Sequence, residues 1–196
     1  MKATANALFA AVLAAGLFAA GPEVVAAPKE KTEKLTAEQK AAEREARLKL
    51  AADGLDRLYS VQPDARQAVE KAVGYAVFDI NSIYAILLVG QKGKGVLFDN
   101  ATKTPVFMLS TRAGTGPGVG KQRVFQIFVF KTKDAMDQFR LAGNTGGDIS
   151  GSISTGKEGS VRSFNPSIEI YQVAESGSAV QATWGGTLYS VDADLK

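Results

Sequence analysis

The sequence has 196 residues, of which 45% are hydrophobic and 22% are charged. These proportions are typical of a globular protein and exclude a collagen-like, coiled-coil or largely disordered chain. The sequence contains neither cysteine nor histidine. It therefore excludes disulfide bonds, thiolate nucleophiles, catalytic triads with histidine, and zinc or haem sites with histidine ligands. The composition favours a protein without catalytic activity, and we expect neither a cofactor nor a metal site.

The formal net charge of +3 is too small to indicate a nucleic-acid-binding protein. The charge is unevenly distributed, because residues 73–163 contain 11 basic and 6 acidic side chains, whereas residues 164–196 contain 1 and 4. One interpretation is a basic face that binds an anionic surface. The other is an uneven scatter of surface charge without a binding role.

The first 26 residues have the pattern of a secretory signal peptide, in which Lys2 precedes an apolar, alanine-rich run over Ala5–Ala20. This run is shorter than the roughly 18–20 residues that a membrane-spanning helix needs, so a retained transmembrane helix is the weaker interpretation. Small residues place the cleavage site between Ala26 and Ala27. We therefore expect an exported protein, periplasmic in a host with two membranes and extracellular otherwise.

Two helices are expected before the strands begin. Residues 27–62 predict a charged linker followed by a long helix, in which Thr36 and Gln39 form a capping box. A proline and an acidic residue then start a second, short helix over 65–73. This second helix opens the segment 63–196, which we expect to be the main domain.

From Tyr75 onward the sequence is rich in strand-forming residues. Strands are expected at 75–80, 83–89, 95–98, 105–109, 124–130, 168–173 and 180–184, with one helix over 133–141. The last of these strands could continue past Gly185-Gly186 through 188–191. The runs 83–89 and 124–130 are expected to lie mostly in the core. Turns or loops are expected at 81–82, 90–94, 99–102, the glycine-rich segment 114–120, and Gly177, and weak strands or a loop at 144–163. The pattern predicts an α+β fold, with N-terminal helices followed by a curled, mainly antiparallel sheet or partial barrel and one internal helix.

Five short motifs follow one another between residues 65 and 191. They are Gly74-Tyr75-Ala76-Val77-Phe78, Gly93-x-Gly95-Val96-Leu97, Pro105-Val106-Phe107 before a glycine-rich stretch, Asp134-Ala135-Met136-x-x-Phe139, and Ile170-Tyr171. In this order they resemble the SYLF domain. The resemblance implies a phospholipid-binding module without catalytic activity, and bacterial members of this family are commonly exported.

The chain departs from the SYLF pattern at three places and is therefore similar to a divergent member. Asp79 stands where the family usually has proline, residues 83–89 lack the usual glycines, and Lys103-Thr104 replace an expected tryptophan.

Two segments supply candidate binding residues for an anion. Two lysines flank Gly93 in an expected hairpin turn, where they could meet lipid phosphates. The glycine-rich segment could expose backbone N–H groups to an anion, with basic residues on both sides. Together these residues predict one basic rim that consists of Lys92, Lys94, Arg112, Lys121 and Arg123. The alternatives are a soluble charged turn and a flexible loop in which the glycines merely permit the turns.

Three patterns that could indicate chemistry are incomplete. Ser154-Thr155-Gly156-Lys157 matches the Ser-x-x-Lys pattern of acyl-enzymes, but flanking glycines oppose the required helix start and no Lys-Thr-Gly motif follows. The glycine-rich segment fails the phosphate-loop pattern at Thr115 and Gln122. Asp192 and Asp194 supply too few oxygen ligands for calcium.

The sequence thus predicts a non-enzymatic, exported, SYLF-like protein that binds anionic phospholipid or another lipid through its basic rim and an apolar surface. A structural or protein-docking module of the cell envelope is the alternative, and a Ser-Lys acyl-enzyme is a third interpretation.

Overall fold

The computed structural model describes residues 35–145, 152–153, 159–163, 165–181 and 184–196. The expected signal peptide, the start of the linker and the Ser154–Lys157 motif lie outside these residues. Within the described ranges, no helix combines the length and the apolar character that crossing a membrane requires.

The helices begin and end close to where the sequence predicts. Helix α1 covers Ala37–Val61, and the expected capping box is confirmed, because Thr36 accepts the Gln39 N–H and donates its own N–H to the Gln39 side chain. Helix α2 covers Ala65–Lys71. Helix α3, at Lys133–Thr145, extends past its expected end, and a short 3-10 helix, η1, covers Ala193–Leu195.

Strands β1 (Gly74–Asp99) and β2 (Pro105–Phe130) form one long antiparallel hairpin. Their register runs from Gly74 opposite Phe130 to Phe98 opposite Pro105, with one irregularity at the middle. The turns expected at 81–82 and 90–94 and the loop expected at 114–120 are therefore wrong. Glycine, asparagine and serine are poor strand formers by themselves, but here the cross-strand hydrogen bonds of the hairpin hold them in the sheet.

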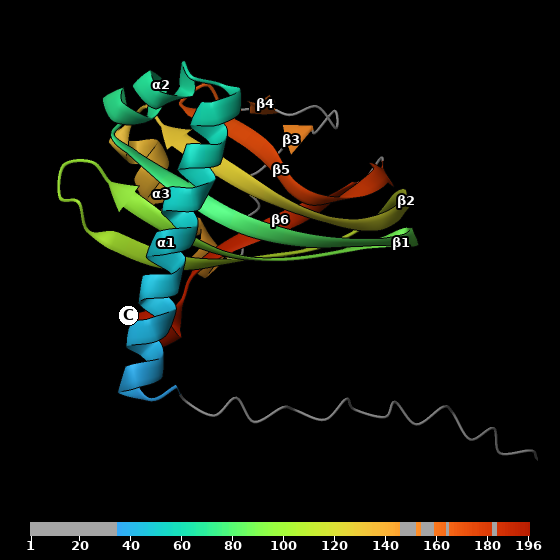
Figure 1. The fold of residues 1–196 in the computed structure, drawn as a ribbon, viewed down its shortest axis with the longest axis horizontal. Coiled ribbons are helices and arrows are strands. Elements are labelled where there is room, and N and C mark those ends of the chain that lie inside the picture. Colours follow the sequence, from blue (N-terminus) through green and yellow to red (C-terminus); the bar gives the residue numbers. More distant parts are fainter. Residues whose placement is uncertain (1–34, 146–151, 154–158, 164, 182–183) are drawn as a thin grey trace, which may run out of the picture. The chain divides into compact units, whose positions relative to one another are not determined.

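The remaining strands extend this hairpin into an antiparallel sheet of six strands. Strand β5 (Ile168–Gln181) pairs with the second half of β2, and β6 (Trp184–Val191) pairs with the first half. Two short strands, β3 (Ser152–Ile153) and β4 (Gly159–Ser163), continue the sheet beyond β5. The turn expected at Gly177 is wrong, because this residue pairs with β2 inside β5. The sheet is not closed into a barrel, and the predicted α+β class is confirmed (Figure 1).

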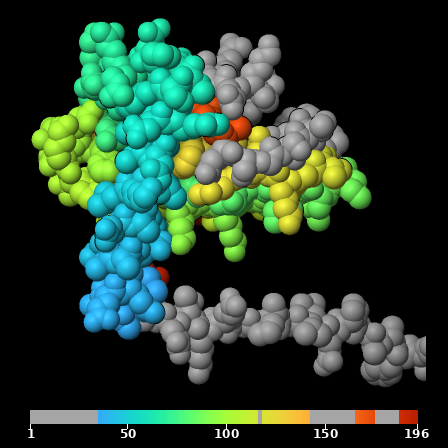
Figure 2. All heavy atoms as spheres, in the orientation of Figure 1, coloured from blue at the N-terminus to red at the C-terminus, as the bar shows by residue number. Residues whose placement is uncertain are grey.

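The hairpin bends so that the two halves of β1 approach each other. The Asn100 N–H donates to Val73 O over 2.9 Å at one end of this contact. A Cβ atom on Gly95 would lie 2.6 Å from Val77 O, so only glycine permits this approach. The bend lies at the end of the sheet farthest from α1 (Figure 1). In Figure 2 the green and yellow surface of β1 and β2 extends away from the blue to teal surface of α1.

Helices α1 and α3 cover opposite faces of the sheet. Gly54 of α1 lies so close to Val77 that a Cβ there would be 2.8 Å from its Cγ1. The next residue, Phe78, points to the other face, where its ring packs against Phe139 of α3. Two buried clusters result, one under α1 and α2 and one under α3. We call the face of the sheet under α1 and α2 the outer face, and the face under α3 the inner face.

Candidate anion-binding face

Four of the five expected basic residues lie on the outer face. Lys92 and Lys94 alternate with Gly93 in β1 and share the face of Val96, which belongs to the cluster under α1. Lys121 and Arg123 pair with Ile83 and Asn81, which share the face of Val77. We call these four residues, Lys92, Lys94, Lys121 and Arg123, the basic face.

Arg112 is separate from the basic face. It pairs with Gln91 and therefore lies on the inner face, with Gly93 and Ser110. Its Nε atom is buried and has no hydrogen-bond partner within the part of the chain that the structure describes.

The two expected anion-binding loops are not formed. Lys92, Gly93 and Lys94 lie in the middle of paired strand, opposite Thr111, Ser110 and Leu109. Gly114 pairs with residues of β1 and β6, and Gly118 pairs with residues of β1 and β5. Apart from residues 116 and 117, the residues of this segment pair with neighbouring strands, so the expected loop with a concavity of free N–H groups is wrong.

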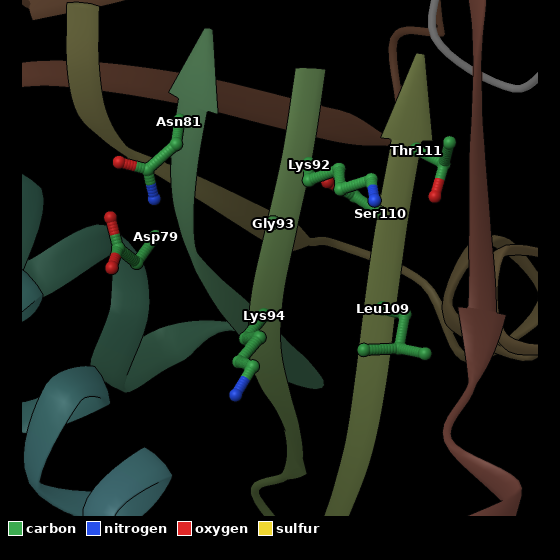
Figure 3. Close-up of a pocket in the computed structure, with 8 residues that line it drawn as sticks. All are labelled: Asp79, Asn81, Lys92, Gly93, Lys94, Leu109, Ser110 and Thr111. Atoms are coloured by element: carbon green, nitrogen blue, oxygen red, sulfur yellow. The ribbon is translucent and has the colours of Figure 1, made fainter. Parts of the chain in front are cut away.

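A cavity of about 390 Å³ lies beside the basic face. Residues from both halves of β1 and from the first half of β2 line it: Asp79, Asn81, Lys92, Gly93, Lys94, Leu109, Ser110 and Thr111. Figure 3 shows Asp79 and Asn81 on one side, across from the strand that carries Lys92 and Lys94. The cavity therefore combines cationic groups with neutral hydrogen-bonding groups.

Arg123 is held by Asp79. Its Nε and Nη2 atoms each lie 2.8 Å from one oxygen of the Asp79 carboxylate, which is the bidentate geometry of a strong ion pair. This pair fixes the direction of the guanidinium and neutralises the carboxylate at the cavity wall.

Lys94 is held by α1. Its Nζ lies 2.7 Å from Glu43 Oε1, and the same oxygen accepts from Arg47 Nε at 3.0 Å. Burial raises the pKa of Glu43, but the hydrogen bonds and charges of Lys94 and Arg47 outweigh it, so the pKa lies below its ordinary value. Buried Arg47 also reaches Asp192 Oδ2 at 2.7 Å.

Lys92 and Lys121 differ from the other two cations, because neither has an acidic partner among the described residues. Both side chains are exposed. They are the cations of this face that are free to bind an external anion.

Ser110 supplies a further polar group. It lines the cavity and is buried, and its Oγ atom has no hydrogen-bond partner within the described part of the chain. A buried hydroxyl without a partner is uncommon, and this one lies on the inner face, on the other side of the sheet from Lys92 and Thr111.

The bend of the hairpin exposes apolar side chains. Ile83, Ile86, Leu87, Leu88 and Val119 are between 55% and 72% exposed. We call these five residues the apolar end. The sequence predicts that the runs 83–89 and 124–130 both lie mostly in the core. This is correct for 124–130, where every residue is buried, including the polar Gln126. It is wrong for 83–89, where only Tyr84 and Val89 are buried.

The residues that the structure describes contain no group of three or more acidic side chains that could hold a metal ion. Asp192 and Asp194 form a helix cap, because Asp192 Oδ1 accepts the Asp194 N–H.

Sequence reasoning missed Asp79 as the partner of Arg123, and Glu43 as the partner of Lys94. The residues of each pair are 44 and 51 positions apart in the chain. The unusual acid at position 79 was the one available signal, because a carboxylate in an apolar strand needs a cation beside it.

No family model matches the chain. Over 148 residues, 74% of its length, the chain is 32% identical to a protein named Beta cell expansion factor A from Aeromonas veronii. The match covers 56% of that protein, so the chain spans little more than half of its length. The chain is therefore similar, over most of its own length, to one part of Beta cell expansion factor A.

Proposed function

We propose that this chain is an exported, non-enzymatic protein whose SYLF-like domain binds anionic phospholipid through the basic face. The observation that carries the proposal is the placement of four cations on one face beside the cavity, two of which have no acidic partner among the residues that the structure describes. The resemblance to the SYLF domain supports the lipid as the ligand.

The chemistry of the cavity suits a phosphate group. Lys92 supplies an ammonium group, and Thr111, its cross-strand partner on the same face, supplies a hydroxyl donor. Asp79 does not repel the phosphate, because Arg123 neutralises it. Each exposed cation near an anionic membrane contributes about 1 kcal/mol, so several must act together.

Co-sedimentation with vesicles tests the proposal. The chain from Ala27 to Lys196, which contains every described residue, is mixed with vesicles of phosphatidylcholine alone or of an equimolar mixture with phosphatidylglycerol. We expect binding to the mixed vesicles only, and weaker binding at high salt because salt screens the exposed cations.

A pair of matched variants locates the binding face. Lys92→Glu with Lys121→Glu removes the two free cations and reverses their charge, so we expect a loss of binding of about tenfold or more. Lys71→Glu with Lys103→Glu makes the same change of net charge on exposed residues away from this face, and we expect far less effect. Equal binding to both kinds of vesicle, or equal loss in both variants, contradicts the proposal. A protein-docking module would show no dependence on lipid charge.

A further inference from the structure

The apolar end is a large exposed patch on a domain whose core is otherwise well covered. Its five side chains come from two neighbouring strands at the bend of the hairpin, and each is more than half exposed. Soluble domains rarely leave several large aliphatic side chains together in water, and such patches mark interaction surfaces.

The backbone at this place is strained. Ile86 has φ 57°, a left-handed conformation that a β-branched residue adopts only at a cost. The register slips between Ile86 and Leu88, and Leu87 has no partner across the hairpin. This irregularity is not required for burial, because Ile86, Leu87 and Leu88 are all exposed. It instead keeps three consecutive aliphatic residues at the tip of the bend.

Cations border this patch on the same sheet. Lys121 lies directly opposite Ile83, and Lys92 follows Leu88 by four residues in β1, about 13 Å along the strand. Apolar side chains at the tip with cations behind them match the order of layers in a bilayer, where the acyl chains lie beyond the phosphates. A protein partner would need an apolar pocket surrounded by acidic side chains. An anionic bilayer offers an apolar layer and an anionic layer to any domain with this arrangement, and it needs no complementary shape.

We infer that the apolar end inserts into the acyl-chain region of an anionic bilayer while Lys92 and Lys121 remain at the level of the phosphates. The inference rests on the proposed function and adds the depth and orientation of the bound domain. Shallow burial of about 5–10 Å is typical of proteins that lie at the membrane interface. The lysine stems allow their ammonium groups to stay in the headgroup layer.

A single fluorescent label tests insertion, since the chain has no native cysteine. Leu87→Cys is labelled with an environment-sensitive fluorophore and mixed with the equimolar phosphatidylglycerol and phosphatidylcholine vesicles. We expect a blue shift of the emission and quenching by nitroxide groups placed in the acyl chains. Leu141→Cys is the matched control, because Leu141 is an exposed leucine on α3, and we expect its emission to stay that of a label in water.

A second pair of variants measures the apolar contribution without a label. Leu87→Ser with Leu88→Ser changes only exposed side chains, so the fold is retained. We expect weak, salt-sensitive binding to remain, while binding at high salt falls about tenfold or more. Leu48→Ser with Leu141→Ser makes the same change elsewhere and should leave binding unchanged.

The outcomes separate the two proposals. If the wild type binds anionic vesicles in a salt-sensitive way but the label at position 87 stays in water, insertion is overturned and the proposed function stands. If the label inserts equally into neutral vesicles, insertion is supported and the charge-based function is overturned. If the protein binds neither kind of vesicle, both are overturned.

Discussion

Asp79 and Arg123 form an ion pair in which the two side chains differ in their exposure to solvent. The Asp79 side chain is 10% exposed, whereas the Arg123 side chain is 39% exposed. The arginine side chain therefore keeps access to water when the carboxylate is removed, but the carboxylate stays largely buried when the arginine is removed.

The two single variants should accordingly differ in stability. We expect Arg123→Ala to lower the free energy of unfolding by about 3 kcal/mol, because it strands the carboxylate. Asp79→Asn should lower it by about 1 kcal/mol. Urea denaturation measures both values. Lys49→Ala, which breaks an exposed pair with Asp53, serves as the control and should change the free energy by less than about 0.5 kcal/mol. Equal losses for the first two variants would contradict this view of the pair.

At the scale of elements, the sequence predicts the helices better than the strands. The capping box and the proline before α2 are local signals, so α1 and α2 begin where expected. The hairpin of β1 and β2 depends on pairing between residues up to 56 positions apart, as between Gly74 and Phe130, and no local window contains that information. For the same reason the basic residues could be recognised as a group, but their division between the two faces could not.

Gly95 permits the close approach of the two halves of β1, and Gly90 offers a matched comparison within the same strand. A Cβ at position 95 would meet the backbone oxygen of Val77, whereas a Cβ at position 90 meets nothing within 4 Å. We expect Gly95→Ala to lower the free energy of unfolding by about 3 kcal/mol, through overpacking against backbone. Gly90→Ala should be neutral or slightly stabilising. Chemical denaturation of the two variants distinguishes them, and a similar result for both would argue against close packing here.

The contact between α1 and β1 should depend on pH. The folded-state pKa of Glu43 is lowered, so its contribution to stability is present above its unfolded pKa of 4.5 and is lost as the pH falls through the folded value. We expect the wild type to lose more stability than Glu43→Gln when the pH falls below about 5. The measurement is the free energy of unfolding against pH for both proteins. Parallel curves would show that the interaction of Glu43 with Lys94 and Arg47 does not stabilise the fold.

Across the whole domain, one buried ion pair joins distant parts of the chain. Arg47 in α1 and Asp192 before η1 are 145 positions apart, and both side chains are almost fully buried. Arg47 also donates to Met108 O in β2, so three elements meet at a single guanidinium. Nothing local in the sequence marks Arg47 as buried, because it lies in a helix with many charged residues.

We expect Asp192→Ala to lower the free energy of unfolding by about 3–5 kcal/mol, since it leaves Arg47 buried and without its closest carboxylate. Asp194→Ala, two residues further on, removes an exposed carboxylate and should cost less than about 1 kcal/mol. Thermal and urea denaturation provide the comparison. A small effect at Asp192 would mean that Glu43 alone is sufficient to compensate the arginine.

Strand β1 lies at one end of the strand order and pairs with β2 alone among the described strands. A long strand with an unpaired edge invites a second molecule to add to the sheet, and lysines on such a strand oppose this aggregation. We therefore expect Lys92 and Lys94 to have a second consequence for the molecule, which is to oppose strand pairing between copies of the chain. If the proposed function holds, we expect neutral replacement of Lys92 to weaken lipid binding and to promote self-association, whereas Lys92→Glu weakens lipid binding but keeps the edge charged. Lys94 does not suit this comparison, because its ammonium group also pairs with Glu43 of α1.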